Sequence, residues 1–557
     1  MKGRPFLAVL LVIALLALGL GWGGWWLVWR RGPLRLQHHT LTVPRAARFV
    51  PRQAPLSLFL FSDGDQPVDY VRAVAPLRQR EAATQTVERL RDGAFAAAGL
   101  DYHDELAHWL APEMGLALFD TPDNTSPDSG WLLVLSSRDG EGARRFLQRF
   151  WQSRSLAGSG LQVSQYRGMG LISGRGALVG RDPVPLATAL VQDDLVLLAS
   201  GRTTLERALD VSQIDELNQA GLSPLRQGVE QLGEGMALLV ARSGAFGPWL
   251  GWPALEGGEG KPGTLLVGTL QPRGRELVFE GLLHLPPATP AESPPSVHAE
   301  VPPTRTLTAV VPPEESPPVD LSRALLQGLR GDSTSLALLH HPAALLQHPW
   351  LTPLLGRISH PPAGGPLPPL LVAADPELLL LSSGPEGWLI GTSGPTPRTE
   401  SLEAPLAAQG LIEAPLEIGG ESVTVWTRLQ APGGAAGRGV ERDQLRASVA
   451  GWRQQTDGLA WWGGNLAQLN RPSASRSALD RQRQLAELAE PQAALRWALG
   501  REAAGELLQR WHPWTLLTSL AGGALTAGPP SLSVAIDTHT TPVHWIAHLH
   551  FATESHG

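Results

Sequence analysis

The sequence contains no cysteine, and only two of its 557 residues, Lys2 and Lys261, are lysines. The absence of cysteine excludes disulfides, thiolate metal ligands and cysteine nucleophiles. The net charge is −7, so the chain lacks the basic surface that is typical of nucleic-acid-binding proteins. A nucleophile elbow and a Walker phosphate loop are also missing. We therefore expect no nucleic-acid partner, no cofactor and no catalytic residue.

The longest apolar stretch lies at the start of the chain. Residues 6–29 carry no charge, and Arg30 and Arg31 follow them directly. At about 1.5 Å per residue, a helix over this stretch would be about 36 Å long, enough to cross a hydrocarbon core of about 30 Å. Four tryptophans lie at its C-terminal end, where indole rings prefer a membrane interface. The stretch predicts a transmembrane anchor. The alternative is a cleaved signal peptide, which is usually shorter.

A short N-terminal tail ahead of a single anchor favours export of the chain that follows. We therefore expect a single-pass membrane protein with its bulk outside the cytoplasm, in the periplasm or an equivalent lumen. The predicted parts are, in order, a tail (1–5), the anchor (6–29), a juxtamembrane linker (30–47), a first α+β half (48–285), a Pro-rich linker (286–305) and a second α+β half (306–557).

Two alignments indicate that the halves are related. Residues 56–73, LSLFLFSDGDQPVDYVRA, align without gaps with residues 307–324, LTAVVPPEESPPVDLSRA. Residues 236–250 align with residues 336–351, and both contain an apolar run followed by a tryptophan. We therefore expect an α+β fold with an N-terminal transmembrane helix and a repeated ectodomain of mostly antiparallel sheet plus helices, in two related halves.

A tryptophan recurs at the end of a predicted helix and before a predicted hairpin at four places: Trp109, Trp249, Trp350 and Trp514. The hairpins that follow are GLALFDTP with GWLLVLSS, GTLLVGTL with ELVFEGLLHL, PLLVAA with ELLLLSS, and SLSVAI with VHWIAHLHF. Short turns between such strands favour antiparallel pairing. We expect each indole ring to pack on the sheet that it precedes, which is a structural role.

The segment DYHDELAHWLAPEMGLALF, residues 101–119, combines two histidines with four carboxylates. His103 and His108 are five residues apart, which places them about 140° apart around a helix. A zinc-binding helix needs histidines four residues apart on one face. We therefore interpret this segment as the end of a helix and the start of a strand.

The C-terminal segment HTTPVHWIAHLHF is the stronger metal candidate. On a strand, His544, His548 and His550 point to one face, where neighbouring imidazoles can bind a transition metal. The alternative is a half-exposed edge strand, because the local sequence contributes no carboxylate. A weaker candidate is a second group of three histidines near a proline: His340, His341 and His348. The sequence alone assigns none of these residues to a metal site.

The order of these features resembles a known family. The anchor is followed by FVPRQAPLSLFL, then by GLDYHDELAHWLAPEMGLALF and an apolar hairpin. This pattern is similar to the cyanobacterial membrane-anchored proteins that carry domain of unknown function 3352. The matching residues are Pro51, Pro55, Gly99, Leu100, Asp101, Tyr102, Trp109, Leu110 and Glu113. The sequence departs from the pattern at Ala111 and Pro112, where a glycine is expected. The resemblance implies a cyanobacterial membrane setting, including the thylakoid lumen, and it implies no reaction.

These observations favour a non-catalytic ectodomain that binds or scaffolds a protein partner in the periplasm or lumen. A membrane-anchored, metal-dependent hydrolase that uses the C-terminal histidines is one alternative. A second alternative is an envelope lipid-handling protein, which would need a continuous apolar groove.

Overall fold

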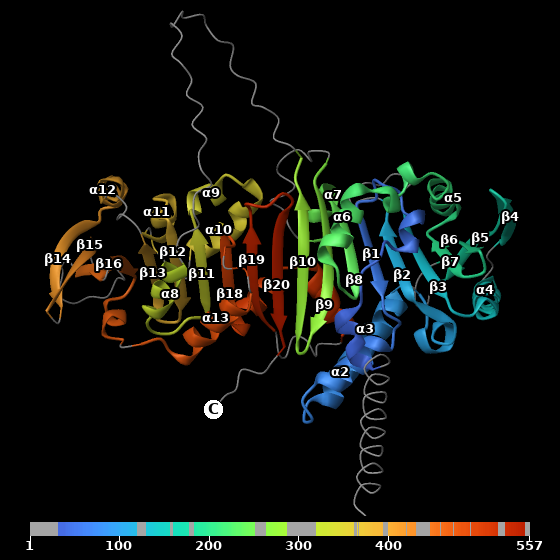
Figure 1. Ribbon diagram of the computed structural model, residues 1–557, viewed down its shortest axis with the longest axis horizontal. Helices are drawn as coiled ribbons and strands as arrows, with labels where there is room; N and C mark the ends of the chain where they lie inside the picture. Colours follow the sequence, from blue (N-terminus) through green and yellow to red (C-terminus); the bar gives the residue numbers. More distant parts are fainter. Residues whose placement is uncertain are drawn as a thin grey trace, which may run out of the picture.

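The chain forms a single 20-stranded sheet with helices packed against it in a computed structural model (Figure 1). The structure describes residues 32–97, 99–119, 130–155, 160–177, 183–250, 263–286, 319–360, 365, 367–393, 399–418, 420–430, 446–456, 458–471, 473–488, 490, 492–521 and 530–551.

The strands of the first half are β1 (Leu56–Phe61), β2 (Leu110–Leu118), β3 (Trp131–Ser137), β4 (Gln162–Tyr166), β5 (Met169–Ala177), β6 (Pro183–Val191), β7 (Leu195–Ala199), β8 (Ala237–Arg242), β9 (Leu265–Arg273) and β10 (Glu276–His284). Those of the second half are β11 (Ser335–His340), β12 (Leu378–Gly384), β13 (Gly387–Ser393), β14 (Ile412–Ile418), β15 (Glu421–Gln430), β16 (Arg446–Thr456), β17 (Leu459–Gly463), β18 (Leu495–Leu499), β19 (Ser531–Asp537) and β20 (Val543–His550).

The helices connect these strands. In the first half they are α2 (Gln66–Val74), α3 (Arg80–Ala97), α4 (Gly140–Ser155), α5 (Arg202–Val211), α6 (Ser223–Leu232) and α7 (Ser243–Phe246). In the second half they are α8 (Val319–Gln327), α9 (Pro342–Leu346), α10 (Thr352–Ser359), α11 (Leu367–Ala373), α12 (Thr399–Ala407), α13 (Arg476–Glu487), α14 (Arg501–Leu508) and α15 (His512–Leu520).

Every pair of neighbouring strands in the described part of the sheet is antiparallel. Along the long axis in Figure 1 the order is β4-β5-β6-β7-β3-β2-β1-β8-β9-β10, followed by β20-β19-β18-β11-β12-β13-β17-β16-β15-β14. The second half therefore repeats the topology of the first, with β11 in the place of β1 and β20 in the place of β10. The two halves meet at the antiparallel β10–β20 pair, which we call the seam.

The register of the strands also repeats. The pair Leu60↔Ala237 of β1 and β8 has its counterpart in Leu339↔Leu495 of β11 and β18. The end of the β9–β10 hairpin, Leu265↔His284, corresponds in the same way to Ser531↔His550 of β19–β20. Each position in these strands of one half therefore has a defined counterpart in the other.

This correspondence corrects the first predicted repeat. The counterpart of β1 is β11, which begins at residue 335, and not the segment 307–324 that aligns with it in sequence. The second alignment pairs β8 with β11, which also occupy different places in the two halves. They share a local context, however, because each is a strand followed by a helix and a tryptophan, and then by a hairpin. The alignment therefore detected this smaller unit.

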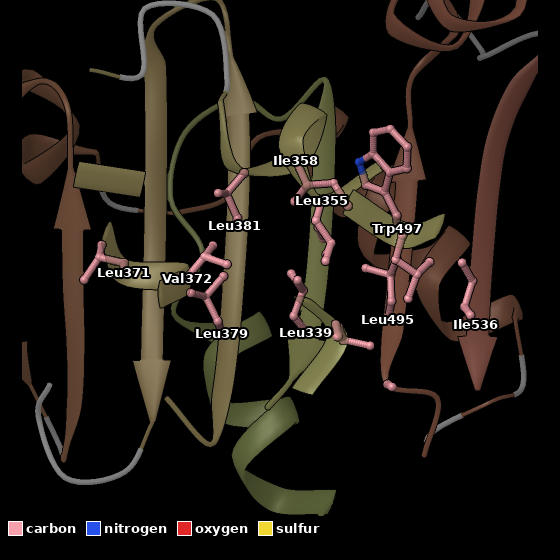
Figure 2. Packing of buried hydrophobic residues seen from close by; sticks show 14 of the residues in the cluster. Leu339, Leu355, Ile358, Leu371, Val372, Leu379, Leu381, Leu495, Trp497 and Ile536 are labelled. Carbon is pink, nitrogen blue, oxygen red and sulfur yellow. The ribbon is translucent and has the colours of Figure 1, made fainter. Parts of the chain in front are cut away.

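Several interior strands are buried on both faces. All five residues of β7 and β17 are buried, which explains why these sequences are continuous apolar runs with no alternation. All five residues of β18 are buried as well, and they include Arg496. The outermost strands β4 and β14 are mostly exposed. One core crosses the seam, since it joins Leu266 and Leu283 of the first half to Ile536 and Val543 of the second. Figure 2 shows part of this core, where Leu355 and Ile358 of α10 lie near Leu339 of β11.

The predicted fold class and localisation need correction. No helix among the described residues is long and apolar enough to cross a membrane. The longest of them, α3, spans 18 residues and carries several charged side chains, whereas a transmembrane helix needs about 20 apolar ones. This finding contradicts the predicted fold with a transmembrane helix and the predicted single-pass topology. The segment 6–29, on which both predictions depended, lies outside the described residues, as does nearly all of the predicted linker 286–305. The structure supports one antiparallel sheet with packed helices.

Three of the four predicted hairpins are confirmed, as β2–β3, β9–β10 and β19–β20. The strand predicted for PLLVAA is wrong, because its first five residues belong to α11, and β12 pairs with β13 instead. A short apolar run that is buried on all sides has no periodicity to separate helix from strand. Trp109, Trp350 and Trp514 are buried, and Trp249 packs against the core that crosses the seam.

Candidate metal centre

Histidines and carboxylates from both halves meet at one end of the seam. In the β10–β20 register, Glu276 lies opposite His550 and Val278 lies opposite His548. Directly opposed residues of antiparallel strands project from the same face of the sheet. On that face β19 places Ser531 beside His550 and Ser533 beside His548. The helix α13 covers this region, since the Gln484 side-chain amide donates a hydrogen bond to Ser531 Oγ over 2.8 Å.

The donor atoms of this group are close enough to surround one ion. Glu276 Oε1 lies 3.0 Å from His550 Nδ1, and Glu276 Oε2 lies 3.4 Å from His548 Nδ1. Ligand atoms of Glu276, Glu487 and His550 all lie within 4.8 Å of one another. Ligands bound at about 2.0–2.2 Å from a metal lie up to about 4.4 Å apart, so small rotations would complete the geometry. We call Glu276, Glu487, His548 and His550 the seam cluster.

The surroundings of the two histidines suit metal ligation. The side chains of His548 and His550 are only 5% and 8% exposed. Without an ion, His550 Nδ1 donates its proton to the Glu276 carboxylate 3.0 Å away, whereas His550 Nε2 lies 3.1 Å from the Ser533 hydroxyl. A cation that displaces the Nδ1 proton would bind that nitrogen, and the Ser533 oxygen could then accept a hydrogen bond from Nε2–H. Such a partner on the far ring nitrogen is the usual way in which proteins orient a metal-binding histidine. Neither ring nitrogen of His548 makes a hydrogen bond within the described part of the chain.

The charge of the cluster is also favourable. The neighbouring rings of His548 and His550 lower the pKa of Glu276 from 4.5 to about 2, against the opposing effect of burial. Glu276 is therefore a carboxylate at neutral pH, ready to ligate a cation. Glu487, at the end of α13, is exposed and lies at the outer side of the cluster.

The structure separates His544 from the other two C-terminal histidines. Its Nε2 lies 3.0 Å from Glu280 Oε1, and its Nδ1 lies 3.8 Å from Glu490 Oε1. The hydrogen bond with Glu280 raises the pKa of His544. The histidine triplet is thus divided between an ion pair and the seam cluster.

The carboxylates that complete the seam cluster could not be found from the local sequence. Glu276 lies in the predicted strand ELVFEGLLHL, and Glu487 lies in a helix more than 200 residues further along the chain. The signal that could have found Glu276 was the pairing of this strand with VHWIAHLHF. Each strand was assigned to its own hairpin, and the contact between the two hairpins was not predicted.

The other histidines considered from the sequence do not form a metal group within the described residues. His103 lies in a π-helical turn, Tyr102–Leu106, with its Nε2 2.8 Å from Nη2 of Arg91. Because a guanidinium only donates hydrogen bonds, this Nε2 is the acceptor and has no lone pair left for a metal. His108 is exposed, and the segment is the end of a helix and the start of β2, as predicted. Of the second histidine group, His340 is buried, and His348 packs near Trp350.

The comparisons with known proteins give a family and no activity. No curated protein matches the chain. Crystal forms III and I of TP0453 are similar to part of it, at 11% and 14% sequence identity. Each match covers 44% of this chain, and the matches cover 80% and 79% of the TP0453 chains, respectively. The TM-scores are 0.25 and 0.24, too low to indicate a shared fold or function.

The family model of a protein of unknown function, DUF3352, matches residues 10–536, nearly the whole length. A cyanobacterial source stays a prediction. The chain belongs to the DUF3352 family.

Proposed function

We propose that the protein binds one divalent transition-metal ion at the seam cluster, in a non-catalytic binding role. The observation that carries this proposal is the identity of the counterpart residues in the first half. There, the pair Val267↔Leu282 stands where the second half has Ser533↔His548, and Leu265 stands where it has Ser531. The first half shows that this fold packs these three positions with apolar side chains, whereas the counterpart of His550 is itself a histidine, His284. Ser531, Ser533 and His548 therefore serve something other than folding.

The donor set indicates the class of metal. Imidazole nitrogens and carboxylate oxygens together suit first-row ions such as Zn²⁺, Mn²⁺, Fe²⁺ and Co²⁺. The chain offers no thiolate that would select softer ions.

The burial of His548 and His550 supports a binding role. A catalytic zinc site keeps one position open for water or substrate, whereas a structural site is closed by protein ligands. An ion at the seam would join Glu276 of the first half to three ligands of the second and so stabilise the junction. The hydrolase and lipid-handling alternatives stay predictions, as does a protein partner.

Equilibrium dialysis of the purified full-length chain against Zn²⁺, followed by elemental analysis, tests the proposal. We expect one equivalent of bound metal, and we expect His550→Ala to lose it. His544→Ala is the matched control, because it removes a histidine from the same strand face outside the seam cluster. A chain that retains no stoichiometric metal, or a His550→Ala variant that binds as the wild type does, would refute the site.

A further inference from the structure

A second polar group lies on the same face of the second half, around Arg496. This arginine is on β18, where its neighbours across the sheet are Leu338 on β11 and Ala535 on β19. It is only 8% exposed, and both neighbours belong to an apolar core. A full positive charge is thus held among hydrophobic side chains.

Arg496 has no counterion in the described structure. No ion pair or hydrogen bond engages its side chain there, and its Nε is buried with no acceptor. Burial lowers the pKa of Arg496, and no acidic side chain opposes that effect. Buried charges in proteins are normally paired or hydrogen-bonded, because desolvation without a partner is unfavourable. Arg496 is therefore a buried cation that has no anionic partner in the described structure.

His340 adds a second unsatisfied group beside it. This residue ends β11, and its backbone amide donates a hydrogen bond to the carbonyl of Ala494, two residues before Arg496. His340 is also 8% exposed, and its Nε2 has no hydrogen-bond partner in the described chain. Burial first, and then the charges of Arg496, His341 and His539, lower the pKa of His340 to about 4. The groups that act on His340 are all basic.

The fold does not require these polar residues. The pair Leu338↔Arg496 has its counterpart in Phe59↔Leu238 of the first half, and His340 corresponds to Phe61, the last residue of β1. Leu238 is fully buried and Phe61 is 4% exposed. The first half thus places two apolar side chains where the second half places an unpaired arginine and an unpaired histidine.

We propose that Arg496 and His340 form a binding site for an oxoanion, the shared chemistry of phosphate and carboxylate groups. The planar guanidinium can donate two parallel hydrogen bonds to such a group. With its lowered pKa, His340 is neutral at pH 7 and can donate one N–H to the same anion. The site uses none of the residues of the seam cluster and does not depend on the metal.

Isothermal titration calorimetry of the full-length chain at pH 7 tests this site, with inorganic phosphate and acetate as separate probes. We expect saturable binding of at least one probe and at least a tenfold loss of affinity in Arg496→Leu. That variant introduces the residue of the first half, so its fold should be preserved, which circular dichroism can check. Arg483→Leu is the control, because Arg483 is exposed and pairs with Asp480.

Each outcome has one meaning. Binding of phosphate alone identifies a phosphate-type ligand, and binding of acetate alone identifies a carboxylate. Arg496→Lys, which keeps the charge and loses the planar fork, should bind more weakly than the wild type and more tightly than Arg496→Leu. Failure of the wild type to bind either probe, or equal binding by the wild type and a folded Arg496→Leu variant, overturns the proposal.

Discussion

The hairpins β9–β10 and β19–β20 have one backbone arrangement and two different chemistries. They occupy equivalent places on the two sides of the seam and share a register. In the first, Leu265, Val267 and Leu282 are buried under α6, where Gly228 allows close approach to Val267. In the second, Ser531, Ser533 and His548 take these positions, and Gln484 of α13 contacts Ser531.

This difference distinguishes residues that are needed for folding from residues that have another role. Apolar side chains in the first half show that the sheet is stable with leucine and valine at these positions. Burying polar groups instead is unfavourable unless they find partners. Buried polar residues with apolar counterparts are therefore the best markers of function. They are His548 with Ser531 and Ser533 at the seam, and Arg496 with His340.

The largest expected effect comes from moving the arginine into the first half. Leu238→Arg would bury a guanidinium where no anion site exists, so we expect a loss of about 3–5 kcal/mol in the free energy of unfolding. Urea denaturation of the variant and the wild type measures it. The matched control is Arg496→Leu, which should unfold at the same or a higher urea concentration. If Leu238→Arg were as stable as the wild type, positions 238 and 496 would accept a buried guanidinium equally well, which would contradict the comparison.

A smaller effect is expected when Ser533 is replaced by its counterpart, valine. Ser533→Val removes the partner of His550 Nε2 without changing a ligand, and loss of such a partner typically weakens metal affinity about 10–100-fold. Competition with a coloured zinc chelator measures the change, and the unfolding midpoint without metal should not fall. Ser531→Ala serves as the control, since the Ser531 hydroxyl accepts a hydrogen bond from Gln484, whereas the hydroxyl beside His550 Nε2 is that of Ser533. Unchanged zinc affinity in Ser533→Val would count against the proposed role of this serine.

The smallest effect is a change in pH dependence at His340. Because its pKa is about 4 in the fold and 6.5 in the unfolded chain, the unfolded chain binds more protons between these values. His340 therefore destabilises the fold increasingly as the pH falls from about 6.5 to about 4. His340→Phe, the residue of the first half, should reduce the difference between unfolding midpoints at pH 7 and pH 5. An undiminished difference would place the pH dependence elsewhere.

The sequence predicts local structure better than it predicts the site. Three hairpins were found because their strands are joined by short turns, whereas PLLVAA was assigned to the wrong structure because a fully buried run shows no periodicity. The repeat was harder to see, because the halves share topology and register while their aligned side chains differ. The sequence named His548 and His550 as metal candidates together with His544, and it assigned none of the three to a site. Glu276 and Glu487 could not be predicted, since they reach the histidines only through the pairing of β10 with β20 and the packing of α13.

The central claim is that one metal ion joins the two halves at the seam. Hydrogen exchange measured by mass spectrometry, with and without one equivalent of Zn²⁺, tests it most directly. We predict slower amide exchange in both β10 and β20 on addition of zinc, with no such change in His550→Ala. Protection confined to one of the two strands, or absent from both, would contradict an ion that is held by residues of both halves.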